Sequence, residues 1–201
     1  MNQRIGLLFL FGLMMLIAVA VGRLVTSSPL PIDLAFATWI HPQRTAMIDD
    51  LMRAGTHFGS ILLLCPGAIA WGLWQHKKRH GAKYAAFVPL SLLFAWASGM
   101  LSKWLVARPR PSLFEPLIQL PLDASFPSGH TLQAAAFAFA LALRPGPISV
   151  GAILAAVLFV AFVGLSRLYL QVHWVSDVIA GALLGLGCVL ILRHHYGTGK
   201  G

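Results

Sequence analysis

Residues 148–165 read ISVGAILAAVLFVAFVGL and include no charged side chain. A run of this length and apolarity is typical of a helix that crosses a bilayer, whose hydrocarbon core needs about 20 apolar residues in helical form. Five further runs nearly free of charge occupy residues 5–22, 58–74, 84–101, 128–143 and 174–192. Polar and apolar residues do not alternate with period two, which argues against a transmembrane β-barrel. The sequence therefore predicts a single all-α domain over residues 1–201, a bundle of six transmembrane helices.

The composition agrees with a membrane protein. Of the 201 residues, 58% are hydrophobic and 10% are charged, whereas a soluble domain has roughly 25% charged residues. Disorder is excluded because disordered chains lack large apolar residues. The net charge of +9 does not indicate a nucleic-acid partner, because the basic residues form no patch interleaved with aromatic residues. Cys65 and Cys188 lie in apolar runs without metal-ligand spacing, as small buried hydrophobic residues do.

Two of the six runs have alternative interpretations. In run 128–143 the purely apolar part, residues 132–143, is short enough for a buried or re-entrant helix. The four-residue connection 144–147 favours a tight helical hairpin, and we interpret the run as a full crossing. In run 5–22, Arg4, the apolar stretch and Ala18-Val19-Ala20 resemble a cleavable signal peptide. The stretch is long for a signal core, which favours an uncleaved first helix.

Charge predicts the orientation of the bundle. With six crossings, both termini and the second and fourth loops share one side, which holds eight of the 15 basic residues and none of the six acidic ones. Of the seven basic residues opposite, Lys103, Arg108, Arg110 and Arg167 belong to segments with a separate use described below. Setting those aside leaves eight against three, so the positive-inside rule places both termini in the cytoplasm. The first group consists of Arg4, Lys77, Lys78, Arg79, Lys83, Arg144, Arg193 and Lys200.

The longest connection, residues 25–57, mixes apolar and polar residues in the manner of a helix that lies in the membrane interface. A loop that packs against the bundle is an equally good interpretation of this segment.

Three segments concentrate the polar groups that lie near the membrane. The first is KWLVARPRP at residues 103–111, where the third helix breaks at two prolines. The second is FPSGH at residues 126–130, in which a proline and a potential serine cap open the fourth helix. The third runs from residue 166 to residue 177, between the fifth and sixth helices. In the predicted topology all three lie on the outer side, so we expect one outward-facing pocket.

The residue types in this pocket suit a phosphate. Lys103, Arg110 and Arg167 supply positive charge, and guanidinium groups bind phosphate oxygens in bidentate fashion. The N-terminus of the fourth helix offers free backbone N–H groups and a positive dipole end, and Gly129 lets an anion approach closely.

Two histidines and an aspartate supply groups for catalysis. His173 and Asp177 are one helical turn apart, so the carboxylate can fix the imidazole tautomer and leave the other ring nitrogen to attack phosphorus. His130, from a different helix, can protonate the departing oxygen.

Taken singly, these residues have ordinary explanations. An Arg-Pro pair near a membrane is commonly a helix stop with a snorkelling cation. Asp49-Asp50 lacks the acidic partners that a metal site needs, so we expect no metal. The convergence of one Lys, three Arg, two His and one Asp on one pocket is what indicates catalysis. The remaining histidines are interpreted as hydrogen-bonded interface residues: His41, His57, His76, His80, His194 and His195.

Together the three segments resemble the signature of the type 2 phosphatidic acid phosphatase superfamily. KxxxxxxRP covers residues 103–111, PSGH covers 127–130 and SRxxxxxHxxxD covers 166–177, each complete and in order. The resemblance implies that His173 is a nucleophile forming a phosphohistidine, that Asp177 orients it and that His130 is the general acid. Only Arg110, and not Arg108, fits the register of the first motif. The resemblance implies phosphate binding by Lys103, Arg110, Ser128, Gly129 and Arg167.

The six apolar runs indicate the integral membrane branch of that superfamily. The resemblance then implies a bacterial plasma-membrane enzyme that hydrolyses lipid phosphates at the outer face, with a lipid phosphate as its partner and no cofactor. Undecaprenyl diphosphate, phosphatidylglycerol phosphate, phosphatidic acid and lipid A phosphates share the reacting group and all stay open as substrates, as does the oligomeric state. One alternative is a phosphotransferase that uses the same intermediate. Another is a phospholipid transporter without chemistry, against which the intact histidine set argues.

Overall fold

The computed structural model describes residues 3–78 and 81–197, which form helices and connecting segments without any strand. All six predicted helices are present, as α1 and as α4 to α8. The segment 25–57, interpreted either as an interfacial helix or as a loop that packs against the bundle, contains two helices, α2 and α3. The α-helices of the described residues are α1 Gln3–Thr26, α2 Pro31–Ile40, α3 Ala46–Thr56, α4 Ile61–Lys77, α5 Gly81–Val106, α6 Gly129–Ala142, α7 Val150–Tyr169 and α8 Val175–Gly197.

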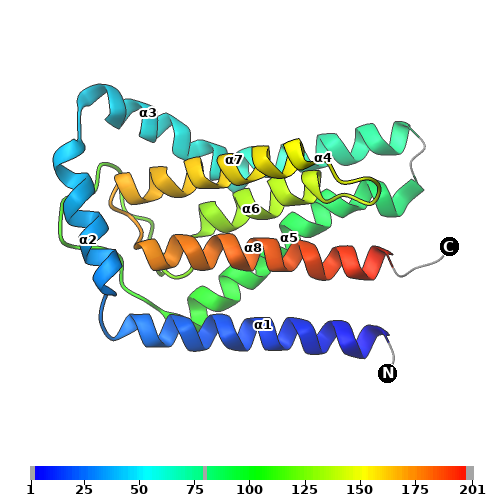
Figure 1. The fold of residues 1–201 in the computed structure, drawn as a ribbon, viewed down its shortest axis with the longest axis horizontal. Coiled ribbons are helices and arrows are strands. Elements are labelled where there is room, and N and C mark those ends of the chain that lie inside the picture. The colour runs from blue at the N-terminus through cyan, green and yellow to red at the C-terminus, as the bar shows by residue number, and fades with distance from the viewer. Residues whose placement is uncertain (1–2, 79–80, 198–201) are drawn as a thin grey trace.

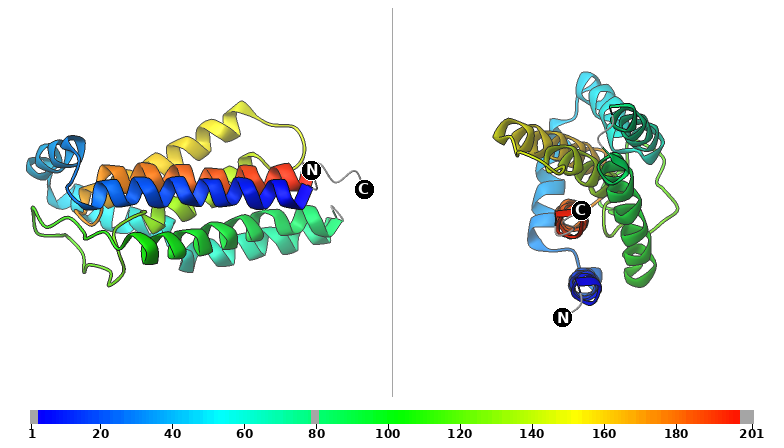
Figure 2. Two further views of the ribbon diagram at one scale, coloured as in Figure 1. Left: turned by 90° about the horizontal axis from the view of Figure 1, so that it is seen from below. Right: turned by 90° about the vertical axis from the view of Figure 1, so that its right-hand side faces the viewer.

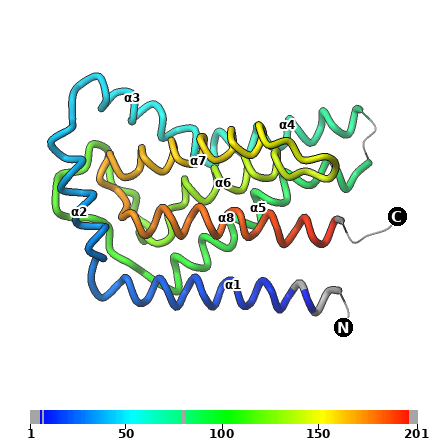
Figure 3. Tube along the Cα trace, viewed as in Figure 1, coloured from blue at the N-terminus to red at the C-terminus, as the bar shows by residue number. Residues whose placement is uncertain are grey.

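The long helices run roughly along the long axis of the molecule, while α2 lies across one end of the bundle (Figure 1). The start of α1 and the end of α8 both lie at the opposite end, as the tube in Figure 3 also shows. This grouping of loops is the one that six crossings predict. The basic residues at the chain-terminal end that the structure describes are Lys77, Lys78, Lys83, Arg144 and Arg193. Arg79, Lys200 and the side chain of Arg4 lie outside the described residues.

Within the described residues, four helical stretches are long and apolar enough to cross a membrane: Leu8–Thr26, Gly81–Val106, Val150–Tyr169 and Val175–Tyr196. A fifth candidate is the pair Ala46–Gly59 and Ile61–Lys77, which is bent by 47°. Large apolar side chains such as Leu62, 85% exposed, cover the outward faces of these helices. Helix α6 has 14 residues, fewer than a lone crossing needs. Multiple apolar helices therefore establish a membrane-type bundle, and the sixth crossing stays a prediction.

Helix α6 is central, because it packs against α5, α7 and α8 (Figure 2). Its approach to α8 depends on two glycines. A Cβ atom on Gly181 would lie 2.6 Å from the carbonyl oxygen of Ser128, and one on Gly185 would lie 2.4 Å from that of Leu132. Small residues of this kind let two helix backbones come close inside a membrane. The first turns of α6 and α8, which carry His130 and Asp177, are thereby held side by side.

Candidate active site

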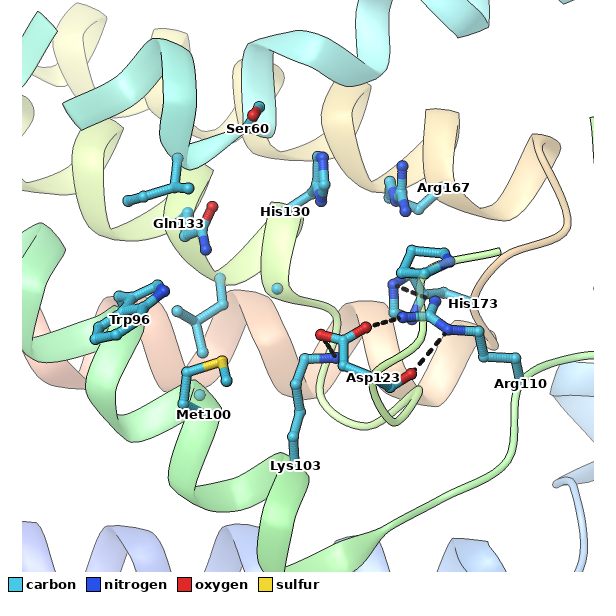
Figure 4. A pocket seen from close by; sticks show the side chains of 15 residues that line it. Ser60, Trp96, Met100, Lys103, Arg110, Asp123, His130, Gln133, Arg167 and His173 are labelled. Carbon is cyan, nitrogen blue, oxygen red and sulfur yellow. Dashed lines mark hydrogen bonds and ion pairs between the residues drawn. The ribbon is translucent and has the colours of Figure 1, made fainter. Parts of the chain in front are cut away.

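A cavity of about 190 Å³ lies among the first turns of α4 and α6 and the last turns of α5 and α7. Six of the eight residues predicted for the site line it: Lys103, Arg110, Gly129, His130, Arg167 and His173 (Figure 4). Asp177 and Ser128 are fully buried and are not among the lining residues. The backbone N–H of Ser128 donates to the carbonyl of Asp177 over 3.0 Å, and the Ser128 hydroxyl accepts from Thr131 over 3.1 Å.

His173 lies in the short turn between α7 and α8, and its two ring nitrogens have different neighbours. Nδ1 lies 3.5 Å from Oδ2 of Asp177, one turn along the chain. Nε2 lies 3.2 Å from Nη1 of Arg110. A guanidinium group can only donate, so Nε2 accepts, and the neutral ring carries its proton on Nδ1. The arrangement assigns the lone pair to Nε2, on the side of the cavity cations.

The electrostatic surroundings keep the imidazole of His173 neutral. Burial lowers the pKa of His173 to about 3, although the hydrogen bond with Asp177 opposes the shift. The positive charges of Arg167 and Arg110 lower the pKa further. A neutral imidazole keeps one ring nitrogen unprotonated, as a nucleophile requires.

Asp177 is held at the start of α8 by donors from three directions. Its Oδ2 accepts from the backbone N–H of Trp174 over 2.9 Å and from the hydroxyl of Ser125. Its Oδ1 accepts from Nη1 of Arg108 over 2.6 Å. The carboxylate that faces His173 is therefore fixed in place on all sides.

Three cations meet at the cavity, and they differ in how they are paired. Lys103 Nζ donates to the carbonyl of Ala124, and Arg110 Nη1 donates to the carbonyl of Val172 over 2.7 Å. Arg167 is 2% exposed and donates from Nη1 to the hydroxyl of Thr56 over 2.6 Å, while its buried Nε has no hydrogen-bond partner. A buried guanidinium donor without a partner indicates a place where an acceptor can bind.

A carboxylate missed by the sequence analysis also lines this cavity. Asp123 lies 3.3 Å from Lys103 Nζ through Oδ2 and 2.6 Å from Arg110 Nη2 through Oδ1 (Figure 4). Partial burial by itself raises the pKa of Asp123, but the charges of Lys103 and Arg110 outweigh that effect and hold it below its usual value. The sequence carried no signal for this role beyond the closeness of Asp123 to the PSGH motif.

The ion pairs that Arg108 forms beneath the cavity were also not predicted from the sequence. The guanidinium of Arg108, which the register of the first motif had set aside, bridges Asp177 and Asp33. Asp33 comes from α2, so the segment between the first two long helices contributes to the site. Thr56, at the end of α3, contributes from the same segment through Arg167. Among the described residues, no group of three His, Cys, Asp or Glu side chains is placed to hold a metal ion.

Comparison with known proteins agrees with the geometry. Residues 84–199 match the PAP2 superfamily. An undecaprenyl-diphosphatase of Sulfolobus acidocaldarius is 42% identical over 151 residues, covering 73% of this chain and 69% of that protein. Phosphatidylglycerophosphatase B of Bacillus subtilis is 33% identical over 156 residues, covering 71% of this chain and 72% of the other.

Two solved structures share the fold. The crystal structure of a transmembrane PAP2-type phosphatidylglycerolphosphate phosphatase from Bacillus subtilis matches with a TM-score of 0.75 and 26% identity, over 100% of this chain and 98% of that one. LpxE of Aquifex aeolicus matches with a TM-score of 0.67 and 23% identity, over 81% of this chain and 95% of the other. The second likeness concerns the fold alone.

Proposed function

This chain belongs to the PAP2 superfamily, and from that premise we propose that it hydrolyses a lipid phosphomonoester or diphosphate through a phosphohistidine on His173. It is a multi-pass membrane protein and a phosphoric ester hydrolase, like its relatives. Undecaprenyl diphosphate and phosphatidylglycerol phosphate are the first substrates to test, because relatives named for those activities cover most of this chain. Phosphatidic acid presents the same reacting group.

One observation carries the proposal: the lone pair of a neutral, oriented imidazole lies at a cavity lined by cations. Nδ1 of His173 is directed to Asp177, and Nε2 lies on the side of Arg110. Binding an anion requires the cations alone. An imidazole held in one tautomer by a buried carboxylate is the arrangement that activates a nucleophile.

In the first step the Nε2 lone pair attacks phosphorus, and the bond between phosphorus and the lipid-side oxygen breaks. The departing oxygen takes a proton from His130, and the lipid leaves as an alcohol or a phosphomonoester. The imidazole becomes positively charged as the P–N bond forms, and Asp177 stabilises that charge through Nδ1–H. Lys103, Arg110 and Arg167 neutralise the phosphoryl oxygens, an effect that strengthens as charge builds in the transition state.

In the second step water attacks the phosphohistidine, and the P–N bond breaks with its electron pair returning to Nε2. His130, now neutral, takes the proton of the attacking water. Inorganic phosphate is released, and both histidines return to their starting states. The protein supplies every group that this sequence of steps needs, so the proposal includes no metal ion.

The proposed topology has six crossings, both termini in the cytoplasm and the cavity at the outer face of the plasma membrane. Support comes from the start of α1, the ends of α4, α6 and α8 and the start of α5, which lie at the end away from the cavity-lining turns (Figure 1). The basic residues in or beside these helix ends are Lys77, Lys78, Lys83, Arg144 and Arg193. Positive residues accumulate on the cytoplasmic side of membrane proteins.

Trapping of the intermediate tests the mechanism. Detergent-purified protein, quenched during turnover of labelled short-chain phosphatidic acid, should carry an acid-labile, alkali-stable phosphoryl group. His173→Ala should abolish the labelling and lower phosphate release by at least about 10³-fold, because a lost nucleophile removes the whole pathway. His76→Ala, an exposed histidine at the opposite end of the bundle, is the control and should retain activity.

Near-normal phosphate release by His173→Ala would overturn the mechanism, and loss of activity in a chelator would overturn metal independence. Analysis of the products separates hydrolysis from transfer, because a phosphotransferase would deliver the label to a second lipid. A phosphate-release panel of undecaprenyl diphosphate, phosphatidylglycerol phosphate and phosphatidic acid on one preparation ranks the substrates.

A further inference from the structure

Beneath the cavity, Arg108 is buried between two carboxylates from different helices. Its Nη1 lies 2.6 Å from Oδ1 of Asp177 on α8, and its Nη2 lies 2.9 Å from Oδ2 of Asp33 on α2. The three side chains are at most 1% exposed. Charges so deeply buried interact strongly, because little water screens them.

Asp33 is surrounded by donors. Its Oδ1 accepts from the backbone N–H of Ser176 over 2.9 Å, and its Oδ2 accepts from the backbone N–H of Leu30 over 3.1 Å. The Ser176 hydroxyl donates to Oδ2 of Asp33 over 2.8 Å and lies 2.7 Å from Nη1 of Arg108. This environment joins the Asp33 carboxylate to both Arg108 and the first turn of α8.

We propose that Asp33 is a positioning residue, which balances the charge of Arg108 so that Asp177 keeps its negative charge for His173. The inference rests on the proposed function, because it concerns the charge that His173 gains in the first step. With one cation between two carboxylates, the buried group has a net charge of −1, and this charge faces the imidazole. Without Asp33, Arg108 and Asp177 would form a neutral pair and stabilise the charged imidazole less.

Charge balance and simple packing predict opposite results for a double substitution. In Asp33→Asn, Asp177 is the only carboxylate that balances the positive charge of Arg108. Phosphohistidine formation should therefore slow about 10- to 100-fold, the size expected for one buried charge at this distance. Arg108→Gln together with Asp33→Asn removes both charges and leaves Asp177 negative again. The double variant should therefore be at least about fivefold faster than Asp33→Asn alone. If the pair only joined α2 to α8, the double variant would be the slower of the two.

The experiment measures the single-turnover rate of phosphoenzyme formation with labelled short-chain phosphatidic acid, and the inhibition constant of inorganic phosphate. Phosphate inhibition should change less than about twofold in both variants, because Lys103, Arg110 and Arg167 are untouched. Thermal unfolding reports whether each variant is folded. Two variants are controls: Ser176→Ala removes the hydrogen bonds of its hydroxyl with Asp33 and Arg108 without changing charge, and Asp49→Asn neutralises an acid that instead accepts from Tyr169. Asp49→Asn should stay within about threefold of wild type, and Ser176→Ala should be slowed less than Asp33→Asn.

The outcomes separate this inference from the proposed function. If the wild type forms no phosphoenzyme, the proposed function fails. The charge-balance role is wrong if the wild type forms the phosphoenzyme and Asp33→Asn forms it as fast as the wild type. It is also wrong if Ser176→Ala is as slow as Asp33→Asn. Should Asp33→Asn not fold, the double variant still decides, because a rate below about a twentieth of the wild-type rate contradicts charge balance.

Discussion

The cavity and the ion network beneath it both carry charge, but they hold it differently. At the cavity, Lys103, Arg110 and Arg167 face a single carboxylate, Asp123, whose side chain is 43% exposed. In the buried network Arg108 joins two carboxylates that are fully covered. The first group has more cations than anions and is open, and the second has more anions than cations and is closed.

This difference separates binding from positioning. An open excess of positive charge attracts an anion, and its half-exposed carboxylate is free to move aside. A closed group keeps its geometry, because removing one partner of a buried ion pair costs about 3–5 kcal/mol. Substitutions at the cavity should therefore change the affinity for phosphate, and substitutions in the network should change the rate of the chemical step.

Among the charged residues of these two regions, the largest effect is expected for Arg167, the cavity cation with no carboxylate partner among the described residues. Arg167→Ala should lower kcat/KM about 10²- to 10³-fold, as loss of one transition-state donor does. Arg167→Lys should fall between this variant and wild type, because an ammonium cannot bind two oxygens at once. Phosphate release from the purified lipid substrates measures both.

Arg144→Ala is the matched control, since it removes an exposed arginine at the far end of the bundle. It should keep activity within about twofold of wild type. If kcat/KM fell less than about fivefold in Arg167→Ala, Arg167 would serve only to hold Thr56. Arg167 would then be a positioning residue and not a phosphate-binding one.

The boundary between the two regions is His173, and its burial predicts how stability depends on pH. Because the pKa of His173 is lowered to about 3, the unfolded chain binds a proton below about pH 6.5 that the folded protein does not. Folding stability should therefore fall as pH drops from about 6.5 towards 3. One unit of pKa difference corresponds to about 1.4 kcal/mol, which shifts the melting temperature of a protein of this size by a few degrees.

Melting curves of wild type and His173→Gln from pH 7 to pH 4 measure this effect. The melting temperature of the wild type should decline more steeply than that of the variant, because only the wild type has the buried imidazole of His173, which must stay neutral. Equal slopes would show that groups other than His173 set the acid sensitivity.

The sequence predicted six of the residues that line the cavity, because the local spacing of the motifs determines them. His173 and Asp177 are one turn apart, and the motifs place Lys103, His130 and Arg167 at helix ends. The helix boundaries were less accurate, since 84–101 was predicted where α5 spans Gly81–Val106. Hydropathy follows the apolar length, whereas α5 ends where Ala107 adopts a left-handed conformation with φ 52°. Lys103 lies in the last turn of α5 and lines the cavity.

The buried network could not be predicted, because it joins residues far apart in the chain. Arg108 and Asp33 are separated by 75 positions, and only the placement of α2 across the end of the bundle brings them together. The charge count places Asp33 in an outer loop, and the register of the first motif excludes Arg108 as a phosphate ligand. Sequence patterns identify functional residues that are close together in the chain. Which distant charged residues contact them depends on how the helices pack.

The smallest effect is expected for Asp123, where the cavity most clearly differs from the network. Its carboxylate makes with Lys103 and Arg110 the contacts that a phosphate oxygen would make, so the two compete for the same cations. Asp123→Asn should lower the inhibition constant of inorganic phosphate about two- to fivefold, because half-exposed ion pairs contribute at most about 1 kcal/mol. Asp50→Asn, which breaks the exposed ion pair with Arg53, should leave the inhibition constant of inorganic phosphate unchanged.

The pH dependence of the Asp123 effect follows from the sign of the shift. The pKa of Asp123 lies below its usual value, so the carboxylate stays ionised from pH 5 to pH 8. The ratio of wild-type to Asp123→Asn inhibition constants should therefore be constant over that range and shrink only in stronger acid. A higher inhibition constant in Asp123→Asn would reverse the interpretation: the carboxylate would then hold Lys103 and Arg110 in place, as Asp33 holds Arg108, and the cavity would be a positioned site like the network beneath it.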